Sequence, residues 1–225
     1  MRRHAPAPSV GGMRIGILGT GNVARALAKG WSTAGHDVVL GSREPENRKN
    51  LDVGTAAVVS LTEAAEHADV LVNATPGTAS LDVLATIGAP ALAGKTLVDV
   101  GVGLTGDMLL AHPNSSLGEE IQAAFPRTPV VKTLCTMDST VMIDPSALRG
   151  PSTVFLSGDD ATAKATAGRL LADLGWPESS QLDLGGITTA RGQEHFALMF
   201  VAIALGTGSH GFNIQVVPPS SANSQ

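Results

Sequence analysis

The chain has 225 residues, of which 43% are hydrophobic and only 3% are aromatic, with no tyrosine. This length allows one large domain, or one domain with a small second one, and the core must be built mainly from Ala, Val, Leu and Ile. The formal net charge of −5 argues against nucleic acid or an anionic membrane as a partner of the whole chain. The single cysteine excludes an internal disulfide framework and fits a reducing cytosol.

The two ends of the chain differ in composition from the rest. Residues 1–12 contain two arginines but no continuous apolar segment, so they predict a disordered arm rather than a secretory signal. Residues 218–225 are rich in Pro and Ser and predict a disordered tail. We therefore expect a cytoplasmic protein that folds over residues 13–217.

The first predicted elements are a buried strand over residues 15–18 and a helix that begins near residue 22. Between them lies Gly19-x-Gly21-x-x-Ala24. Gly19 permits a tight turn, Gly21 lets the backbone approach a pyrophosphate, and Ala24 keeps the helix close to the sheet. The helix N-terminus offers free N–H groups to the anion. Set between a strand and a helix, this pattern indicates a dinucleotide-binding turn rather than a glycine-rich turn without a ligand.

The second predicted strand, residues 36–40, is followed by Gly41-Ser42-Arg43. In an NAD-binding unit an acidic residue near this point binds the ribose hydroxyls, but here a hydroxyl and a guanidinium take its place. Such a pair suits a 2′-phosphate, so the sequence favours NADP over NAD. Arg48 and Lys49 either add positive charge to this site or belong to a solvated basic loop.

Short apolar strands and helices alternate through the rest of the chain. This alternation predicts an α/β fold of the doubly wound Rossmann type, with a mostly parallel sheet covered on both faces. The expected strands are residues 15–18, 36–40, 55–59, 69–74, 96–100, 129–134, 153–156 and 181–184, and the later helices are residues 61–68, 81–87, 117–125, 160–174 and 196–205. Ligands of such sheets bind outside the carboxyl ends of the strands, which places residues 19–22, 41–43, 73–77 and 99–103 along one crevice.

We expect the NADP-binding domain to cover residues 13–150. Residues 151–217 would form a small C-terminal α/β extension that serves substrate binding or dimerisation. Its helix at Phe196 to Leu205 contains no polar residue, yet it is too short to span a bilayer. A helix that is apolar on all sides must be buried by its own domain or by a second subunit, so we expect a homodimer.

Six segments of the chain, taken together and in this order, resemble the NADPH:F420 oxidoreductase family. They are Gly19–Asn22, Gly41–Arg43, Asn73–Pro76, Lys132–Met137, Gly186–Arg191 and Gly208–Phe212. The first four segments would suit many small Rossmann reductases, whereas the last two discriminate better. Enzymes of this family pass hydride between NADP and the deazaflavin coenzyme F420, so the resemblance implies NADP(H) as cofactor and F420 as co-substrate.

The resemblance also implies the roles of individual residues. At the pyrophosphate turn it implies contacts from Thr20 and Asn22, with Gly19, Gly21 and Val23 beside them. Ser42 and Arg43 would bind the 2′-phosphate. The residues expected at the nicotinamide are Asn73, Ala74, Thr75 and Pro76. Those expected to face the deazaflavin are Leu134, Cys135, Thr136, Met137, Gly186, Ile187 and Thr188.

Neither a catalytic acid–base pair nor a metal-binding motif stands out in the sequence. Cys135 has no base beside it in the sequence, so a small buried thiol is favoured over a nucleophile. His210, in a glycine-rich loop, is the one weak catalytic candidate. A deazaflavin acceptor needs no acid–base pair, whereas reduction of an imine, a ketone or a metal chelate would require a proton donor. A non-catalytic NADP-sensing protein, with no second ligand pocket, is the remaining alternative.

Overall fold

The computed structural model describes residues 11–48 and 50–218. The predictions of a disordered arm and tail, and any role of Lys49, fall largely on residues outside this description. Within it, the strands are β1 (Arg14–Leu18), β2 (Asp37–Ser42), β3 (Ala57–Ser60), β4 (Val70–Asn73), β5 (Thr96–Asp99), β6 (Val130–Thr133), β7 (Val154–Ser157) and β8 (Gln181–Asp183).

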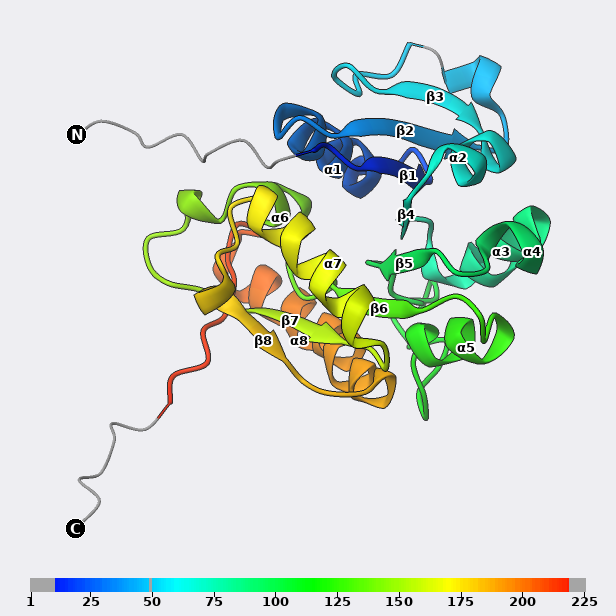
Figure 1. Ribbon diagram of the computed structural model, residues 1–225. Helices are drawn as coiled ribbons and strands as arrows, with labels where there is room; N and C mark the ends of the chain where they lie inside the picture. The colour runs from blue at the N-terminus through cyan, green and yellow to red at the C-terminus, as the bar shows by residue number, and fades with distance from the viewer. Residues whose placement is uncertain (1–10, 49, 219–225) are drawn as a thin grey trace.

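The described strands form one sheet in the order β3-β2-β1-β4-β5-β6-β7-β8 (Figure 1). Neighbouring strands from β3 to β6 are all parallel, β7 is antiparallel to β6, and β8 is parallel to β7. The order of the first six strands is that of a dinucleotide-binding Rossmann sheet. The predicted doubly wound, mostly parallel α/β fold is therefore confirmed.

Helices cover both faces of this sheet. On one face α1 (Asn22–Thr33), α6 (Ser139–Ile143) and α7 (Ala161–Asp173) enclose one apolar core, to which β1 contributes Ile15 and Ile17. On the other face α2 (Leu61–His67), α3 (Ser80–Ile87), α4 (Ala89–Leu92) and α5 (Leu117–Ala124) enclose a second core, which includes Leu18. Because both faces of the central strands are buried, their sequences are apolar at nearly every position.

The C-terminal extension continues the same sheet. Strands β7 and β8 follow β6 at its edge, and α7 packs on the face that α1 also covers. The indole of Trp31 in α1 donates a hydrogen bond to the carbonyl of Leu170 in α7, at 3.0 Å. Residues on both sides of position 150 thus share one sheet and one core, and the boundary proposed there stays a prediction.

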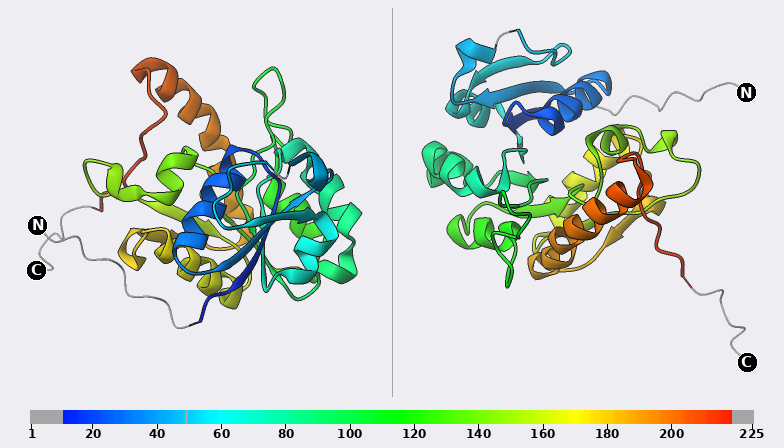
Figure 2. Two further views of the ribbon diagram at one scale, coloured as in Figure 1. Left: turned by 90° about the horizontal axis from the view of Figure 1, so that it is seen from above. Right: turned by 180° about the vertical axis from the view of Figure 1, so that it is seen from behind.

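The last helix, α8 (Ala190–Thr207), begins buried and ends exposed. Gln193 and Glu194 are almost fully buried, whereas the exposed fractions of Met199 and Leu205 are 57% and 81%. In the left view of Figure 2 the C-terminal half of α8 extends outward from the body. Its own chain therefore buries this apolar segment only in part: Ala197 and Ala204 are buried, whereas Leu198, Met199 and Leu205 are exposed. No helix in the described part of the chain is both long enough and apolar enough to cross a membrane.

The sheet packs closely on α2 because β1 carries a glycine at the point of contact. A Cβ atom added at Gly16 would lie 2.3 Å from the carbonyl oxygen of Ala64. We expect Gly16→Ala to lower the free energy of unfolding by about 1–3 kcal/mol, the usual cost of overpacking a core. In thermal unfolding the melting temperature should fall by roughly 2–4 °C for each kcal/mol lost, as is usual for a chain of this size.

Gly192→Ala is the matched control for this prediction. Gly192 is an exposed residue of α8, and a Cβ atom there would meet no described atom within 4 Å. The control should keep or slightly raise the melting temperature, because alanine favours a helix over glycine by about 0.5–1 kcal/mol. Equal melting temperatures for Gly16→Ala and the parent would show that the contact between β1 and α2 is looser than the structure indicates.

Candidate functional site

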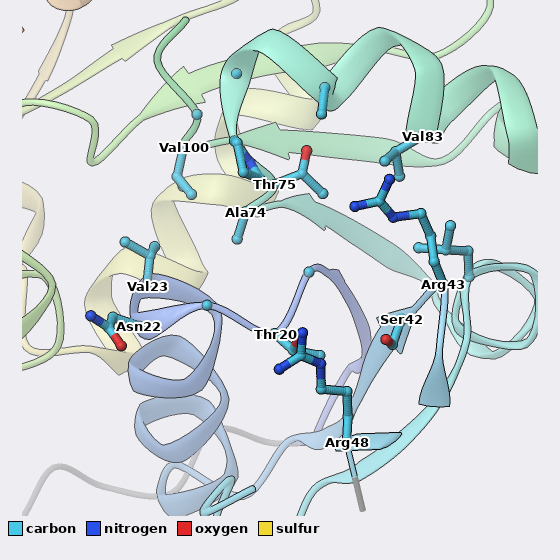
Figure 3. Close-up of a pocket in the computed structure, with 18 of the residues that line it drawn as sticks. Thr20, Asn22, Val23, Ser42, Arg43, Arg48, Ala74, Thr75, Val83 and Val100 are labelled. Atoms are coloured by element: carbon cyan, nitrogen blue, oxygen red, sulfur yellow. The ribbon is translucent and has the colours of Figure 1, made fainter. Parts of the chain in front are cut away.

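A cavity of about 860 Å³ lies at the carboxyl ends of β1, β2, β4 and β5. Figure 3 shows the side chains that reach into it from these strand ends and from α1 and α3. The lining is Gly19–Val23, Gly41–Glu44, Arg48, Leu61, Ala74–Gly77, Ala79, Val83 and Val100–Val102. The structure thus brings together most of the segments that strand order alone assigns to one crevice.

The turn between β1 and α1 forms the middle of the cavity. Gly19 has a φ of +113°, and a Cβ atom there would lie 2.7 Å from the carbonyl oxygen of Ala74, so only glycine fits. A Cβ atom at Gly21 would meet no described atom within 4 Å, because this residue faces the open cavity. Within the described residues no side chain caps the N-terminus of α1, which leaves its first N–H groups free for an anion.

Positive charge gathers at the β2 end of the cavity. Ser42, Arg43 and Arg48 all line it, and in Figure 3 the Arg43 side chain extends toward Val83 while Arg48 points toward Thr20. Among the described residues no ion pair joins either guanidinium to a carboxylate. Two unpaired guanidiniums beside a hydroxyl form a suitable site for a phosphate group.

Three residues that line the cavity near the β2 end were not predicted from the sequence: Glu44, Leu61 and Val83. Glu44 lines the cavity two residues beyond the strand, where no acid was expected, and its carboxylate accepts a hydrogen bond from the Asn47 amide at 3.1 Å. Leu61 and Val83 add an apolar wall from α2 and α3. Glu44 is visible in the sequence directly after Arg43, whereas the apolar wall depends on how the helices pack.

The opposite end of the cavity is formed by the loops that follow β4 and β5. Of the residues expected there, Ala74, Thr75 and Pro76 line the cavity. The loop after β4 packs so closely on the loop after β5 that a Cβ atom at Gly77 would lie 2.3 Å from the backbone nitrogen of Gly103. This end therefore has a compact wall built largely from backbone and small side chains.

Asn73 lies beneath this wall rather than in it. Its side chain is fully buried, and its amide donates to Asp99 Oδ1 at 2.8 Å and to Ser80 Oγ at 3.0 Å. Its Oδ1 accepts from Thr75 Oγ1 at 2.6 Å. Asn73 therefore does not line the cavity, because its hydrogen-bonding groups hold Thr75 and its neighbours, and its expected contact with a cofactor stays a prediction.

The two segments expected to face a deazaflavin lie outside the cavity lining. Leu134, Cys135, Thr136 and Met137 follow β6 and are all buried, and Leu134 has a φ of +60°, a strained value for a bulky residue. The turn over Gly186, Ile187 and Thr188 precedes α8 and packs against β6. The structure brings these segments near each other, and their contact with a second substrate stays a prediction.

The remaining candidates are settled by burial and position. Cys135 is buried, as the sequence predicted, and burial raises the pKa of its thiol to about 12. His210 is exposed in the loop after α8, with its ring centroid 6.0 Å from that of Phe200, and it does not line the cavity. The described geometry gives His210 no catalytic partner in the cavity.

Known proteins resemble this chain in both sequence and structure. A family model described as NADP oxidoreductase, coenzyme F420-dependent, matches residues 14–103. A crystal structure from Arthrobacter sp. FB24, which carries the provisional description of an F420-dependent NADP reductase, is 37% identical with a TM-score of 0.86. This comparison covers 92% of the present chain and 100% of the Arthrobacter chain.

Two further relatives have different substrates in their names. Metalloreductase STEAP3 of Rattus norvegicus is 33% identical over 82% of this chain, which spans only 36% of that protein's length. An imine reductase from Aspergillus terreus, solved in complex with NADPH4, has a TM-score of 0.64 over 88% of this chain and 64% of its own, but at 19% identity it shows the fold alone. The Arthrobacter relative is matched over its full length, and the chain therefore belongs to the family of F420-dependent NADP oxidoreductases and is an NADP-dependent oxidoreductase.

Proposed function

We propose that this enzyme transfers hydride between NADP(H) and the deazaflavin coenzyme F420. The main support for this acceptor is the distribution of charged residues in the lining of the cavity. Every charged residue of the lining, namely Arg43, Glu44 and Arg48, lies at the β2 end. Among the described lining residues at the other end, from Ala74 to Gly77 and from Val100 to Val102, none is titratable.

This distribution favours an acceptor that needs no proton donor from the protein. Reduction of an imine or a ketone by hydride leaves a nitrogen or oxygen that must be protonated, usually by a positioned side chain. Among the described lining residues at this end, the only side-chain hydroxyl is that of Thr75, which donates a hydrogen bond to Asn73 Oδ1. A deazaflavin can delocalise the added charge over its ring system, so positioning alone suffices.

Different residues of the cavity would bind different parts of NADP(H). The bound cofactor would supply the hydride. Ser42, Arg43 and Arg48 would bind the 2′-phosphate, and the α1 N-terminus at Gly21 would bind the pyrophosphate. Val23 and the loop from Val100 to Val102 would exclude water from one face of the nicotinamide. The other ring face would remain for the second substrate.

One alternative acceptor is supported by a relative. The similarity to a metalloreductase makes a metal chelate the second candidate. An imine or ketone stands lower, since the described cavity offers no acid for it. A protein that only senses NADP would bind NADPH without oxidising it in the presence of any acceptor.

Mixing the enzyme and NADPH with each acceptor in a stopped-flow instrument decides among these functions. We expect rapid loss of NADPH absorbance together with bleaching of the deazaflavin, and slow or no oxidation with a ferric chelate or a cyclic imine. Oxidation by the ferric chelate or the imine alone would overturn the proposed acceptor. Tight NADPH binding with no oxidation by any acceptor would identify a sensor.

Cofactor choice gives a second prediction, which rests on Arg43. A charge-assisted hydrogen bond to phosphate contributes about 1.5–3 kcal/mol, so Arg43→Ala should weaken NADPH binding by roughly one to two decades. NADH lacks the 2′-phosphate, and its affinity should hardly change. Arg149→Ala removes the same charge from an exposed residue that does not line the cavity, and it should alter neither affinity. Equal losses for NADPH and NADH would assign Arg43 a structural role.

We also propose that the enzyme is a homodimer in the cytoplasm. Leu198, Met199 and Leu205 expose an apolar face on α8, which a second copy of the chain can cover. The free thiol of Cys135 agrees with a reducing compartment. Light scattering at micromolar concentration should give the mass of a dimer for the parent and of a monomer for Leu205→Glu. A parent protein that scatters as a monomer contradicts this assembly.

A further inference from the structure

A buried lysine lies beneath the cavity. Lys132, on β6, is fully buried and donates to Asp99 Oδ2 at 2.8 Å, to Glu194 Oε1 at 2.7 Å and to the carbonyl oxygen of Gly101. All three of its N–H groups are thus used. Burial by itself would lower the pKa of this ammonium, but the two carboxylates hold the pKa above its usual range. Lys132 is therefore a permanent buried cation.

One side of this cluster holds the wall of the cavity. Asp99 Oδ1 accepts from the Asn73 amide at 2.8 Å and from the backbone N–H of Gly101 at 3.1 Å. The N–H of Gly101 is bound to Asp99 and its carbonyl to Lys132, and Asn73 in turn holds Thr75. Thr75 and Gly101 both line the cavity, at its β4–β5 end. Lys132 therefore holds Gly101 directly, and it holds Thr75 through Asp99 and Asn73. These two cavity residues lie in the loops that follow β5 and β4.

The other side of the cluster holds α8. The carboxylate of Glu194 accepts from the backbone N–H groups of Leu117 and Gly118, at 2.9 and 3.1 Å, at the N-terminus of α5. The neighbouring Gln193 donates to the carbonyl of Lys132 at 3.3 Å. These contacts anchor the buried start of α8 to β6 and α5, so the cluster connects the cavity wall to the helix that follows the Gly186 turn.

We propose that Lys132 is a positioning residue, which sets the place of the nicotinamide by holding Thr75 and Gly101. The inference rests on the proposed function, in which the nicotinamide lies at this end of the cavity. A buried ion pair is weak evidence of a role in stability, since packed hydrophobic groups of similar volume often stabilise a core as well. The charged groups instead fix backbone atoms at the cavity surface, as apolar side chains cannot.

The test compares cofactor binding with cofactor placement in Lys132→Met. The proposed phosphate contacts do not involve the cluster, since Arg43 and Arg48 lie at the β2 end of the cavity and the β1–α1 turn lies in its middle, so NADPH affinity should change less than about threefold. Hydride transfer should fall by roughly 10–100-fold, because displacement of a reacting atom by about 1 Å has an effect of that size. Fluorescence anisotropy decay of bound NADPH should show a more mobile nicotinamide than in the parent.

The controls separate positioning from loss of stability. Gly16→Ala destabilises the fold away from the cluster, and it should leave the anisotropy decay and the hydride-transfer rate at parental values. Lys132→Arg retains the cation. It should restore part of the hydride-transfer rate and part of the nicotinamide immobility that Lys132→Met loses. If Lys132→Met does not fold, Asp99→Asn is measured in its place, because it removes the carboxylate that joins Lys132 to Asn73 and to the backbone N–H of Gly101.

The fluorescence measurement needs no acceptor, so it tests the role of Lys132 even if the deazaflavin proves to be the wrong substrate. Failure of the proposed acceptor would abolish transfer in the parent as well as in the variants. The positioning role is overturned if Lys132→Met or its substitute shows parental nicotinamide mobility. It is equally overturned if the variant loses NADPH affinity as strongly as hydride transfer, or if Gly16→Ala shows the same changes.

Discussion

The structure depends on the reversal of strand order at β1. Strand β2 lies on one side of β1 and β4 on the other, so the connections that leave β1 and β4 run over opposite faces of the sheet. Neither connection covers the carboxyl ends of these strands, and the cavity opens between them. Gly19 allows the close approach of the loop after β4, which brings the turn before α1 into the gap. The order of the strands and the course of the backbone therefore place the cavity at this edge of the sheet.

The two ends of the cavity use polar groups in opposite ways. At the β2 end, Arg43 and Arg48 are exposed to the cavity, where they can bind a charged ligand directly. At the β4–β5 end, the charges of Lys132 and Asp99 are buried beneath the lining, and only backbone and small side chains face the ligand. This division suits a cofactor that is anchored by its phosphates and reacts at a neutral ring. Under the proposed function, hydride transfer would need no titratable residue at the β4–β5 end.

The sequence predicted the fold and the position of Ser42 and Arg43 at the crevice, because both depend on local patterns. Apolar strands alternating with helices specify a parallel sheet, and Gly41-Ser42-Arg43 follows a strand whose carboxyl end must face the crevice. Other features depend on residues that are distant in the chain. Nothing near Lys132 in the sequence shows that Asp99 and Glu194 will pair with it in the core. The apolar pattern of α8 shows that Leu205 needs a cover, but not which chain provides it.

In the proposed complex NADP(H) lies along this cavity, with its 2′-phosphate at the carboxyl end of β2 and its nicotinamide at the carboxyl ends of β4 and β5. A crystal structure of the complex with NADP⁺ tests it most directly. We predict the 2′-phosphate within hydrogen-bond distance of Ser42 and of Arg43 or Arg48, the pyrophosphate at the N-terminus of α1, and the nicotinamide against Thr75 and Gly101. A nicotinamide placed at the β2 end, or a 2′-phosphate with no contact to either guanidinium, would contradict the account.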